Sequence, residues 1–328
     1  MVTGGAGYIG SHVSKALAEA GYVPVAYDNL SNGHAASARW GPLVRGDVLD
    51  RAALVATLRK YRIAGVIHLA GVIEVGASVT RPLDYVTINV TGSATLLQAM
   101  AEERINTIVF SSSCAVYGMP ERLPIDEDHP QNPVSPYGGT KLMVEQMLKW
   151  TRAAHGINFM ALRYFNAAGA ARAGEIGEMH HPETHLIPLI LDAALGRRAG
   201  IDIYGSDWET PDGTCVRDFV HVEDLAAAHV LALGHLSAGE ASSFLNLGGG
   251  VGHSVDEVID AVERLTNRKI KRNRVARRAG DAPILLADTR KAQMQLGWCA
   301  THSELDAIIE SAWRWHQRQF SAASKSDI

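Results

Sequence analysis

Residues 2–10 read VTGGAGYIG, and this glycine-rich stretch decides the fold. Gly4, Gly7 and Gly10 stand three residues apart, and the following residues 11–20 carry apolar side chains at helical spacing. Such glycines permit a tight turn, a close approach of another backbone and close packing of the helix on the preceding strand. The helix N-terminus then presents free N–H groups to an anionic phosphate. The stretch therefore predicts a strand, a phosphate-binding loop and a helix, in that order.

An acidic residue, Asp28, ends the next apolar stretch about 20 residues after the loop. A carboxylate at this place accepts hydrogen bonds from the ribose hydroxyls of a dinucleotide and repels a 2′-phosphate. No Arg stands beside Asp28. We therefore predict dinucleotide binding, with NAD favoured over NADP, against the alternative of an ordinary strand-to-helix turn. Because so few residues precede Gly4, we also expect a first strand shorter than usual, as a clipped or alternative start would produce.

Apolar strands and helical patterns alternate along the first half of the chain. The expected strands cover residues 23–27, 65–70, 107–110 and 158–162, and the expected helices cover 11–20, 51–61, 83–103 and 137–155. This alternation predicts an α/β fold with a Rossmann-type, doubly wound parallel sheet, and we assign residues 1–167 to a NAD-binding domain. Beyond Asn166, glycine, histidine and proline residues interrupt the rhythm. We expect residues 168–328 to form a smaller, mixed α/β substrate-binding lobe, with segments near 219–250 returning to the main sheet.

Composition and charge exclude several classes of protein. The 328 residues are 47% hydrophobic and 20% charged, which suits a chain with a sizeable core. Lys and Arg number 31 against 35 Asp and Glu, a net charge of -4 that argues against a nucleic-acid-binding protein. No apolar run reaches the roughly 18 residues of a membrane span, and three scattered cysteines favour a reducing compartment. We therefore expect a cytoplasmic protein without nucleic-acid or membrane partners.

Three polar residues form a candidate catalytic group. Tyr137 and Lys141 lie four residues apart on one face of a predicted helix, and Ser113 follows the predicted strand 107–110. A phenol has a pKa near 10, so it needs a neighbouring cation, here Lys141, to act as a base near neutral pH. Ser113 would lie at the carboxyl edge of the sheet, where such folds bind substrate, and its hydroxyl can relay a proton from a reacting alcohol. The three residues together are typical of a proton-transfer site.

Ten segments of the chain resemble those of one enzyme family. They are TGGAGYIGSH, YDNLSNG, GDVLD, HLAGVIEVGASV, SSSCAVYG, SPYGGTKLMVEQ, LRYFNAAGA, DGTCVRDFVHVEDLA, NLGGGVGHSV and RRAGDAPILLAD. Spread over almost the whole chain, they resemble the extended short-chain dehydrogenase/reductase family, specifically its UDP-glucose (UDP-galactose) 4-epimerases. The resemblance implies reversible C4 epimerisation of UDP-galactose to UDP-glucose through a transient 4-keto sugar, with tightly bound NAD as the cofactor.

The resemblance also implies roles for individual residues. Tyr137, Ser113 and Lys141 would be catalytic. The residues implied to bind NAD are Gly4, Gly7, Tyr8, Ile9, Gly10, Asp28, Asn29, Leu30, Ser31, Asn32, Gly33, Asp47, Val48, Leu69, Ala70, Gly71, Asn89, Ser111, Tyr137, Lys141 and Phe165. Those implied to bind the UDP-sugar are Ser113, Tyr137, Asn166, His185, Leu186, Tyr204, Arg217, Arg278 and Asp281. The resemblance further implies a homodimer formed through the long helices 83–103 and 137–155.

Three positions depart from the family pattern and leave the substrate range open. Ile73 stands where some members carry Lys, and His185 stands where some have an Asn that touches the diphosphate. Leu285 occupies a position often filled by Tyr, and a smaller side chain there would leave room for an N-acetyl group on the sugar. UDP-N-acetylhexosamines and UDP-pentoses therefore remain alternative substrates.

Two other functions fit the residues less well. A 4,6-dehydratase of this family carries acidic residues just after the serine, where this chain has Cys114 and Ala115. A non-catalytic NAD-binding regulator commonly lacks the Tyr or the Lys of the catalytic group, and both are present here. Epimerisation is the function that the residues favour.

Two polar clusters do not indicate a metal or a nucleic acid. Residues 180–185, HHPETH, lack the histidine and carboxylate spacing of a zinc enzyme, so we expect a loop in solvent or near the nucleotide, and no metal site. The basic run 268–278 has no interleaved aromatic residues. We expect it to form a solvated strand whose last residue, Arg278, reaches the diphosphate.

Overall fold

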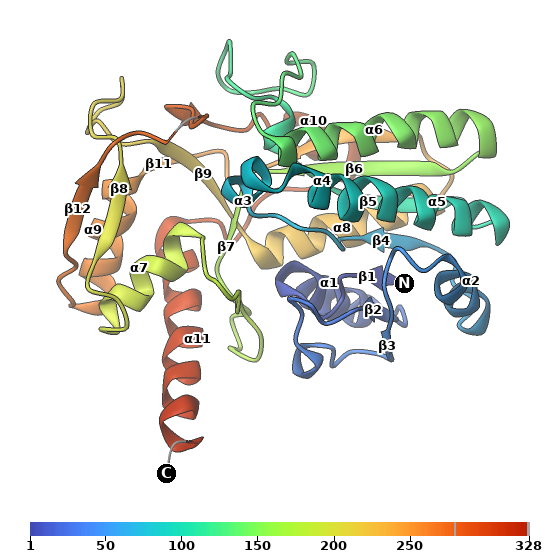
Figure 1. The fold of residues 1–328 in the computed structure, drawn as a ribbon, viewed down its shortest axis with the longest axis horizontal. Coiled ribbons are helices and arrows are strands. Elements are labelled where there is room, and N and C mark those ends of the chain that lie inside the picture. Colours follow the sequence, from blue (N-terminus) through green and yellow to red (C-terminus); the bar gives the residue numbers. More distant parts are fainter. Residues whose placement is uncertain (279, 327–328) are drawn as a thin grey trace.

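A seven-stranded parallel sheet forms the middle layer of the larger lobe, on the right in Figure 1, in a computed structural model that describes residues 1–278 and 280–326. Its strand order is β10-β6-β5-β4-β1-β2-β3. The strands are β1 (Val2–Thr3), β2 (Ala26–Asp28), β3 (Leu43–Arg45), β4 (Val66–His68), β5 (Thr107–Ser113), β6 (Asn158–Tyr164) and β10 (Ser243–Leu247). The order reverses between β1 and β4, so the carboxyl ends of these strands flank the crevice where doubly wound folds bind ligands. The predicted Rossmann-type sheet is confirmed, and its first strand is short.

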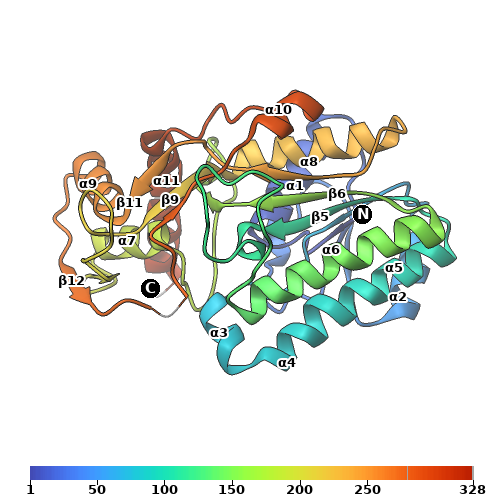
Figure 2. The ribbon, with the colours of Figure 1, turned by 90° about the horizontal axis from the view of Figure 1, so that it is seen from above.

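Helices cover both faces of this sheet (Figure 2). One face carries α1 (Tyr8–Glu19), α8 (Val222–Ser237) and α10 (Arg290–Leu296), and the other carries α2 (Arg51–Lys60), α5 (Gly92–Glu102) and α6 (Pro136–His155). Leu17 of α1 and Leu225 of α8 are buried on the first face, and Leu54 of α2 and Leu148 of α6 on the second. Because each buried leucine contributes about 1.5–3 kcal/mol, the two apolar layers hold the sheet in place.

A second lobe follows the main sheet along the chain and has its own core. One small sheet contains β7 (Asn166–Ala168), β9 (Val216–His221), β11 (Gly252–Ser254) and β13 (Ile284–Leu285), and another pairs β8 (Ile201–Tyr204) with β12 (Arg272–Val275). The helices α7 (Leu186–Ala194), α9 (Val255–Thr266) and α11 (Leu305–Ser326) complete the lobe (Figure 1). Its core includes Ile190, Val258 and Ile309, all fully buried. Between these elements the chain returns to the main sheet through α8 and β10.

The basic run contains strand β12 and pairs with acidic side chains. Arg272 forms ion pairs with Asp256 (3.1 Å), Asp260 and Glu263 (3.3 Å) of α9, and Arg274 pairs with Asp256 at 2.5 Å. The acidic side chains of α9 therefore balance the positive charge of the arginines in β12. The charged side chains of β12 thus join this strand to α9.

The helix predicted without interruption over residues 83–103 is wrong. The structure has α3 (Val75–Thr80), α4 (Pro82–Tyr85), a π-helical turn (Val86–Thr91) and then α5. A π turn widens the helix by one residue per turn and is frequent at functional sites. Here the turn contains Asn89, a buried residue implied to lie near the nicotinamide end of NAD.

The structure also contains the 3₁₀ turns Ala35–Ser37 and Cys114–Val116. Within the described residues, no helix has both the length and the apolar character needed to cross a membrane.

Candidate active site

The glycine loop between β1 and α1 leaves no room for side chains at its key positions. Gly4 has a φ of +69°, a conformation that favours glycine. A Cβ on Gly10 would lie 2.0 Å from the carbonyl oxygen of Gly4, and a Cβ on Gly4 would lie 2.8 Å from the nitrogen of Ala70. Gly7 caps α1, whose first residues are Tyr8 and Ile9. The free N–H groups at this end of the helix therefore face the crevice. Because no side chain stands in the way, a pyrophosphate can come close to the backbone there.

Asp28 lies at the carboxyl end of β2 and ties the loop to the following turn. Its carboxylate accepts hydrogen bonds from the N–H of Ala6 at 3.0 Å and of Leu30 at 2.8 Å. The Asn29 side chain donates to the Asp47 carboxylate at 2.9 Å. These contacts bring together the residues implied to hold the adenosine: Asp28, Asn29, Leu30, Gly33, Asp47 and the buried Val48. Ser31 and Asn32 lie exposed in the same turn.

Asn89 links the π turn to the loop after β4. Its amide accepts from the N–H of Val72 at 2.9 Å and donates to the carbonyl of Val72 at 3.0 Å and to the Thr140 hydroxyl at 3.1 Å. A Cβ on Gly71 would lie 2.8 Å from the Asn89 side-chain oxygen. The segment after β4, residues 69–71, therefore lies between the glycine loop and Asn89.

Ser113, Tyr137 and Lys141 meet at the carboxyl end of β5. Tyr137 and Lys141 lie in the first turns of α6, which begins with Ser135 as its N-cap and Pro136 as its first residue. Ser113 ends β5 and hydrogen-bonds the Tyr137 phenol. The Lys141 ammonium donates to the Ser111 carbonyl at 2.8 Å. The structure thus assembles the three predicted catalytic residues from two separate elements.

Burial dominates the electrostatics of this group. It raises the pKa of the Tyr137 phenol to about 12, and the hydrogen bond with Ser113 offsets only part of the rise. Burial also lowers the pKa of the Lys141 ammonium to about 8, although Glu145 favours the charged form. Lys141 Nζ lies 5.7 Å from the centre of the Tyr137 ring. Further positive charge beside these two groups would favour the phenolate over the phenol.

A buried ion pair behind this edge was not predicted from the sequence. The side chains of Arg163 (β6) and Glu145 (α6) are only 2% and 1% exposed, and they share two hydrogen bonds of 2.9 and 2.8 Å. The Ser112 hydroxyl donates to Glu145 at 2.6 Å, and Arg163 donates to the Tyr117 hydroxyl at 2.8 Å. The pair therefore fixes the strand segment between Ser111 and Ser113. A single Arg within the apolar stretch 159–164 is the signal that could have revealed it.

A second group of predicted residues gathers on the smaller lobe. The Arg217 guanidinium donates to the carbonyl of Ala282 at 2.8 Å and lies 3.7 Å from the Asp281 carboxylate. Arg278 donates to Asp281 at 3.1 Å, and its guanidinium stacks 4.6 Å from the centre of the Tyr204 ring. Two guanidinium groups thus share one carboxylate beside an aromatic ring. This arrangement can bind a phosphate, because guanidinium groups pair with phosphate oxygens in bidentate fashion.

Phe165, which was predicted to bind NAD, and the predicted substrate residues Asn166 and Leu186 lie where the chain enters the smaller lobe and on that lobe. Phe165 is buried against Tyr117 and Ile125, and Asn166 begins β7 beside Phe219 of β9. Leu186 is the first residue of α7 and packs on the core of the smaller lobe.

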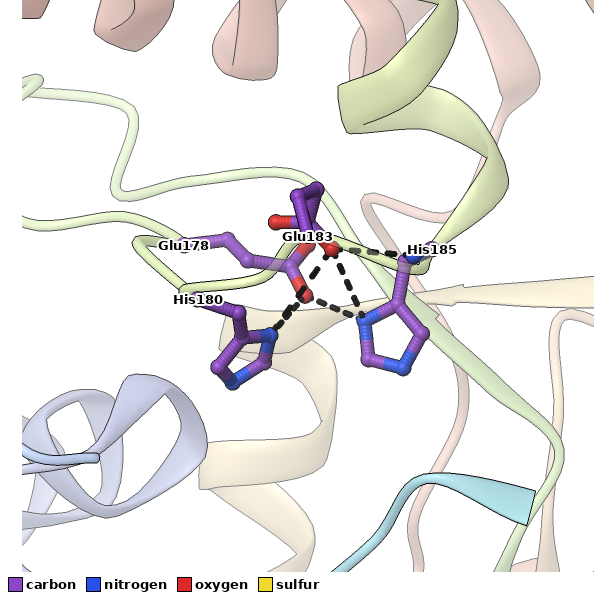
Figure 3. Close-up of side chains that lie close together, drawn as sticks. All are labelled: Glu178, His180, Glu183 and His185. Carbon is purple, nitrogen blue, oxygen red and sulfur yellow. Dashed lines mark hydrogen bonds and ion pairs between the residues drawn. The ribbon is translucent and has the colours of Figure 1, made fainter. Parts of the chain in front are cut away.

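His185, the N-cap of α7, hydrogen-bonds the Glu178 carboxylate through Nδ1. Burial lowers the pKa of His185, but Glu178 and Glu183 outweigh it and raise the value to about 9. The other ring nitrogen points away from Glu178 (Figure 3), and His185 is only half-buried. An imidazolium in this position is free to face an anion through that nitrogen.

Comparison with known proteins identifies the family. Residues 1–248 match the model of the NAD dependent epimerase/dehydratase family. The chain belongs to this family. The resemblance inferred from the ten sequence segments is confirmed, and so is NAD as the cofactor on which the family depends.

Individual members of the family are similar over nearly their whole length. A UDP-glucose 4-epimerase of Rhizobium leguminosarum bv. trifolii is 51% identical over 318 residues, 97% of each chain. The crystal structure of UDP-glucose 4-epimerase from Brucella ovis in complex with NAD is 52% identical, with a TM-score of 0.93 over 95% of this chain and 96% of that chain. The UDP-glucose 4-epimerase from Stenotrophomonas maltophila, with bound NAD and formylated UDP-arabinopyranose, is 39% identical, with a TM-score of 0.94 over 98% of both chains.

Proposed function

We propose that this protein catalyses the reversible C4 epimerisation of UDP-hexoses, converting UDP-galactose to UDP-glucose through a transient 4-keto sugar. The observation that carries the proposal is the convergence of Ser113, Tyr137 and Lys141 at the carboxyl end of β5, beside the glycine loop. Simple deprotonation cannot invert C4, because its hydrogen is not acidic. Oxidation makes C4 planar, so that reduction can occur from either face.

NAD fits the residues of the main sheet. The cradle at Gly4 and Gly10, which a Cβ would fill, suits the pyrophosphate, and Asp28 lies where a carboxylate meets the adenosine ribose. Lys141 and Asn89 border the nicotinamide end in this proposal. When bound, NAD accepts the hydride from C4 and returns it.

Proton transfer is the task of the catalytic group. Tyr137 takes the proton of the 4-hydroxyl and later gives it back, while Ser113 hydrogen-bonds the same oxygen and aligns it with the phenol. Burial raises the pKa of the Tyr137 phenol to about 12, so it needs positive charge to act as a base near neutral pH. Lys141 supplies a positive charge beside the ring. Its hydrogen bond to the Ser111 carbonyl holds it in that position.

Inversion requires the nucleotide to be held firmly and the hexose loosely. Arg217 and Arg278 are the proposed anchors for the diphosphate, which would compete with Asp281 for their guanidinium groups. The ring nitrogen of His185 that points away from Glu178 is a third proposed contact for the same group. With the diphosphate fixed at this end, the keto sugar can turn about its link to the nucleotide and present either face. On this proposal residues 1–167 hold NAD and carry out the chemistry, while most of residues 168–328 hold the nucleotide-sugar.

The breadth of the substrate range depends on the sugar end of the site. Leu285 of β13 is the register partner of Arg217 and packs with the cluster that contains Phe165. An apolar side chain of this size leaves room for a 2-acetamido group, so UDP-N-acetylgalactosamine is an alternative substrate. UDP-arabinose is another, since its epimerisation uses the same chemistry.

A coupled assay with purified protein tests the proposed function. UDP-galactose, UDP-N-acetylgalactosamine and UDP-arabinose are each supplied without added NAD, and turnover is expected because NAD stays bound. Tyr137→Phe should lower turnover about 10²–10⁴-fold, the usual contribution of a general base. If Tyr137→Phe keeps the wild-type rate, Tyr137 is not the base. If wild-type protein binds NAD but converts none of the three substrates, a non-catalytic regulator is the better interpretation.

We also propose a homodimer formed through α5 and α6, in the cytoplasm. Trp150 of α6 is 66% exposed and Met143 of the same helix 51%, and a groove between α5 and α6 is lined by Leu97, Met147 and Trp150. Such exposed apolar area is typical of an interface. Trp150→Asp should convert a dimer to a monomer in sedimentation analysis, whereas Tyr22→Asp, at an exposed aromatic residue outside these helices, should not. A wild-type protein that sediments as a monomer at micromolar concentration refutes the proposal.

A further inference from the structure

Four metal-ligating side chains converge in the segment between β7 and α7. Glu178, His180, Glu183 and His185 each direct one ligand atom to a common point, and these four atoms all lie within 4.8 Å of one another (Figure 3). The Nδ1 atom of His180 lies 2.9 Å from a Glu178 carboxylate oxygen, and the Nδ1 atom of His185 hydrogen-bonds the same oxygen. The donors are therefore two imidazole nitrogens and two carboxylate oxygens.

The four residues alternate along the chain as E-x-H-x-x-E-x-H over positions 178–185. The motif HHPETH alone contains one carboxylate and does not have the spacing of a zinc enzyme. Folding adds Glu178, which comes two residues before His180 and whose side chain is only 4% exposed. The structure thus completes a donor set that the linear spacing did not indicate.

We propose that Glu178, His180, Glu183 and His185 form a binding site for a divalent transition-metal ion, with Zn²⁺ as the best match. Zinc favours four ligands in a tetrahedron, at about 2.0–2.1 Å from imidazole nitrogen and 2.0–2.2 Å from carboxylate oxygen. Ligand atoms of such a site are about 3.3–3.5 Å apart. Three separations between a histidine Nδ1 and a glutamate oxygen in the cluster are 2.9, 3.9 and 4.0 Å, on both sides of this value. Small side-chain movements would therefore suffice to bring the four atoms to the distances of a zinc site. Imidazole together with carboxylate suits zinc better than calcium or magnesium, which take oxygen ligands.

The surroundings orient the ligands, as outer contacts do in metal sites. The Glu183 carboxylate accepts the N–H groups of Thr184 at 2.7 Å and His185 at 2.9 Å. The backbone carbonyl of Glu178 accepts from the Trp315 indole of α11 at 2.9 Å. His180 packs edge-on against the Tyr8 ring, with 6.3 Å between ring centres.

These contacts have two consequences for the proposed site. They join the segment to α1 and to α11, so a metal ion bound here would restrain the segment against both lobes. The His185 side chain is 42% exposed, which provides a path by which the ion can enter.

Metal binding can be measured without reference to catalysis, so this proposal succeeds or fails independently of the epimerase assay. Untagged protein is treated with a chelator, dialysed and titrated with Zn²⁺ by calorimetry. One equivalent per chain is expected, together with a higher melting temperature, because an ion that binds only the folded state stabilises it. A parallel titration with Co²⁺ should give the visible absorption of a four-coordinate ion with nitrogen and oxygen ligands.

Variants decide whether these four residues are the ligands. His180→Ala and the nearly isosteric Glu183→Gln should each weaken Zn²⁺ binding at least about tenfold and weaken the Co²⁺ bands. The matched control is His253→Ala, because His253 and Glu257 form a His–Glu pair at 4.0 Å elsewhere on the smaller lobe, and this variant should bind as the wild type does. Wild-type protein that binds no Zn²⁺ up to millimolar concentration overturns the proposal. Equal affinity in the wild type and in a correctly folded Glu183→Gln variant overturns it as well, and the cluster is then an ordinary ion-pair network.

Discussion

Replacing Glu145 by methionine should destabilise the protein strongly, because it leaves the Arg163 guanidinium buried without its carboxylate. Both side chains are almost fully buried, and two hydrogen bonds of 2.9 and 2.8 Å join them. In Glu145→Met, the hydrogen-bond partners that remain for Arg163 among the described residues are the Tyr117 hydroxyl at 2.8 Å and the Glu127 carbonyl at 3.3 Å. The Ser112 hydroxyl also loses its acceptor.

The expected loss follows from the burial of the pair. Removing one partner of a buried ion pair costs about 3–5 kcal/mol, because the other charge stays desolvated. Replacing both partners by apolar residues of similar volume is often nearly neutral. The double variant Glu145→Met/Arg163→Met should therefore recover more than half of the loss, although Ser112 remains unsatisfied. For a chain of 328 residues, a loss of 3–5 kcal/mol lowers the melting temperature by about 4–7 °C.

The difference in the free energy of unfolding between each variant and the wild type is measured by urea unfolding, followed by tryptophan fluorescence. A thermal scan on the same samples gives the melting temperatures. The control is Arg264→Met, because Arg264 and Asp306 form an ion pair whose side chains are 59% and 49% exposed. Exposed pairs contribute little, so this variant should leave the midpoint unchanged within error. A Glu145→Met variant as stable as the wild type, or a double variant no more stable than Glu145→Met, would refute the reasoning.

Three further predictions concern the nucleotide site and its supporting helix. Gly10→Ala should abolish NAD retention in purified protein, because its Cβ would lie 2.0 Å from the Gly4 carbonyl oxygen; NAD released on denaturation measures this, and wild-type content would contradict it. Asp28→Ala should raise the Kd for NAD about 10- to 100-fold by equilibrium titration, the effect of losing charge-assisted hydrogen bonds worth about 1.5–3 kcal/mol; an unchanged Kd would remove Asp28 from the site. Burial lowers the pKa of His12 to about 4, below its unfolded value near 6.5, so stability present above pH 6.5 is lost as pH falls towards 4. His12→Gln should remove about 3 kcal/mol of that acid sensitivity in urea titrations at pH 7 and pH 4, and parallel losses in both proteins would contradict this.

Local patterns were sufficient to predict the main sheet and the proximity of Ser113, Tyr137 and Lys141. Alternating strands and helices with short connections leave few alternatives to a doubly wound parallel sheet. The glycine loop and the position of Asp28 follow from steric and hydrogen-bonding requirements that act within about 30 residues. Ser113 and Tyr137 were predictable as a pair because the carboxyl ends of parallel strands and the helices that follow them share one edge of the sheet.

Features that depend on contacts between distant segments were not predictable in the same way. The π turn at Val86–Thr91 interrupts a stretch whose sequence pattern is typical of a continuous α-helix. The amide of Asn89, in this turn, forms its hydrogen bonds with Val72 and Thr140, which lie outside that helix. The Glu145–Arg163 pair joins α6 to β6, and no periodicity in either element indicates the partner of the other. Glu178 lies only two residues before His180, but its contact with His180 and His185 depends on how the loop folds back on itself, which the sequence spacing does not indicate.

The central claim is that C4 is inverted by removal and return of its own hydrogen as hydride at the site formed by Ser113, Tyr137 and Lys141. Conversion of UDP-galactose by the purified protein in D₂O, followed by proton NMR of the product, tests it most directly. The proposed mechanism predicts UDP-glucose that retains protium at C4, because the hydride never exchanges with solvent. Deuterium at C4 of the product would show inversion by deprotonation and would contradict the mechanism.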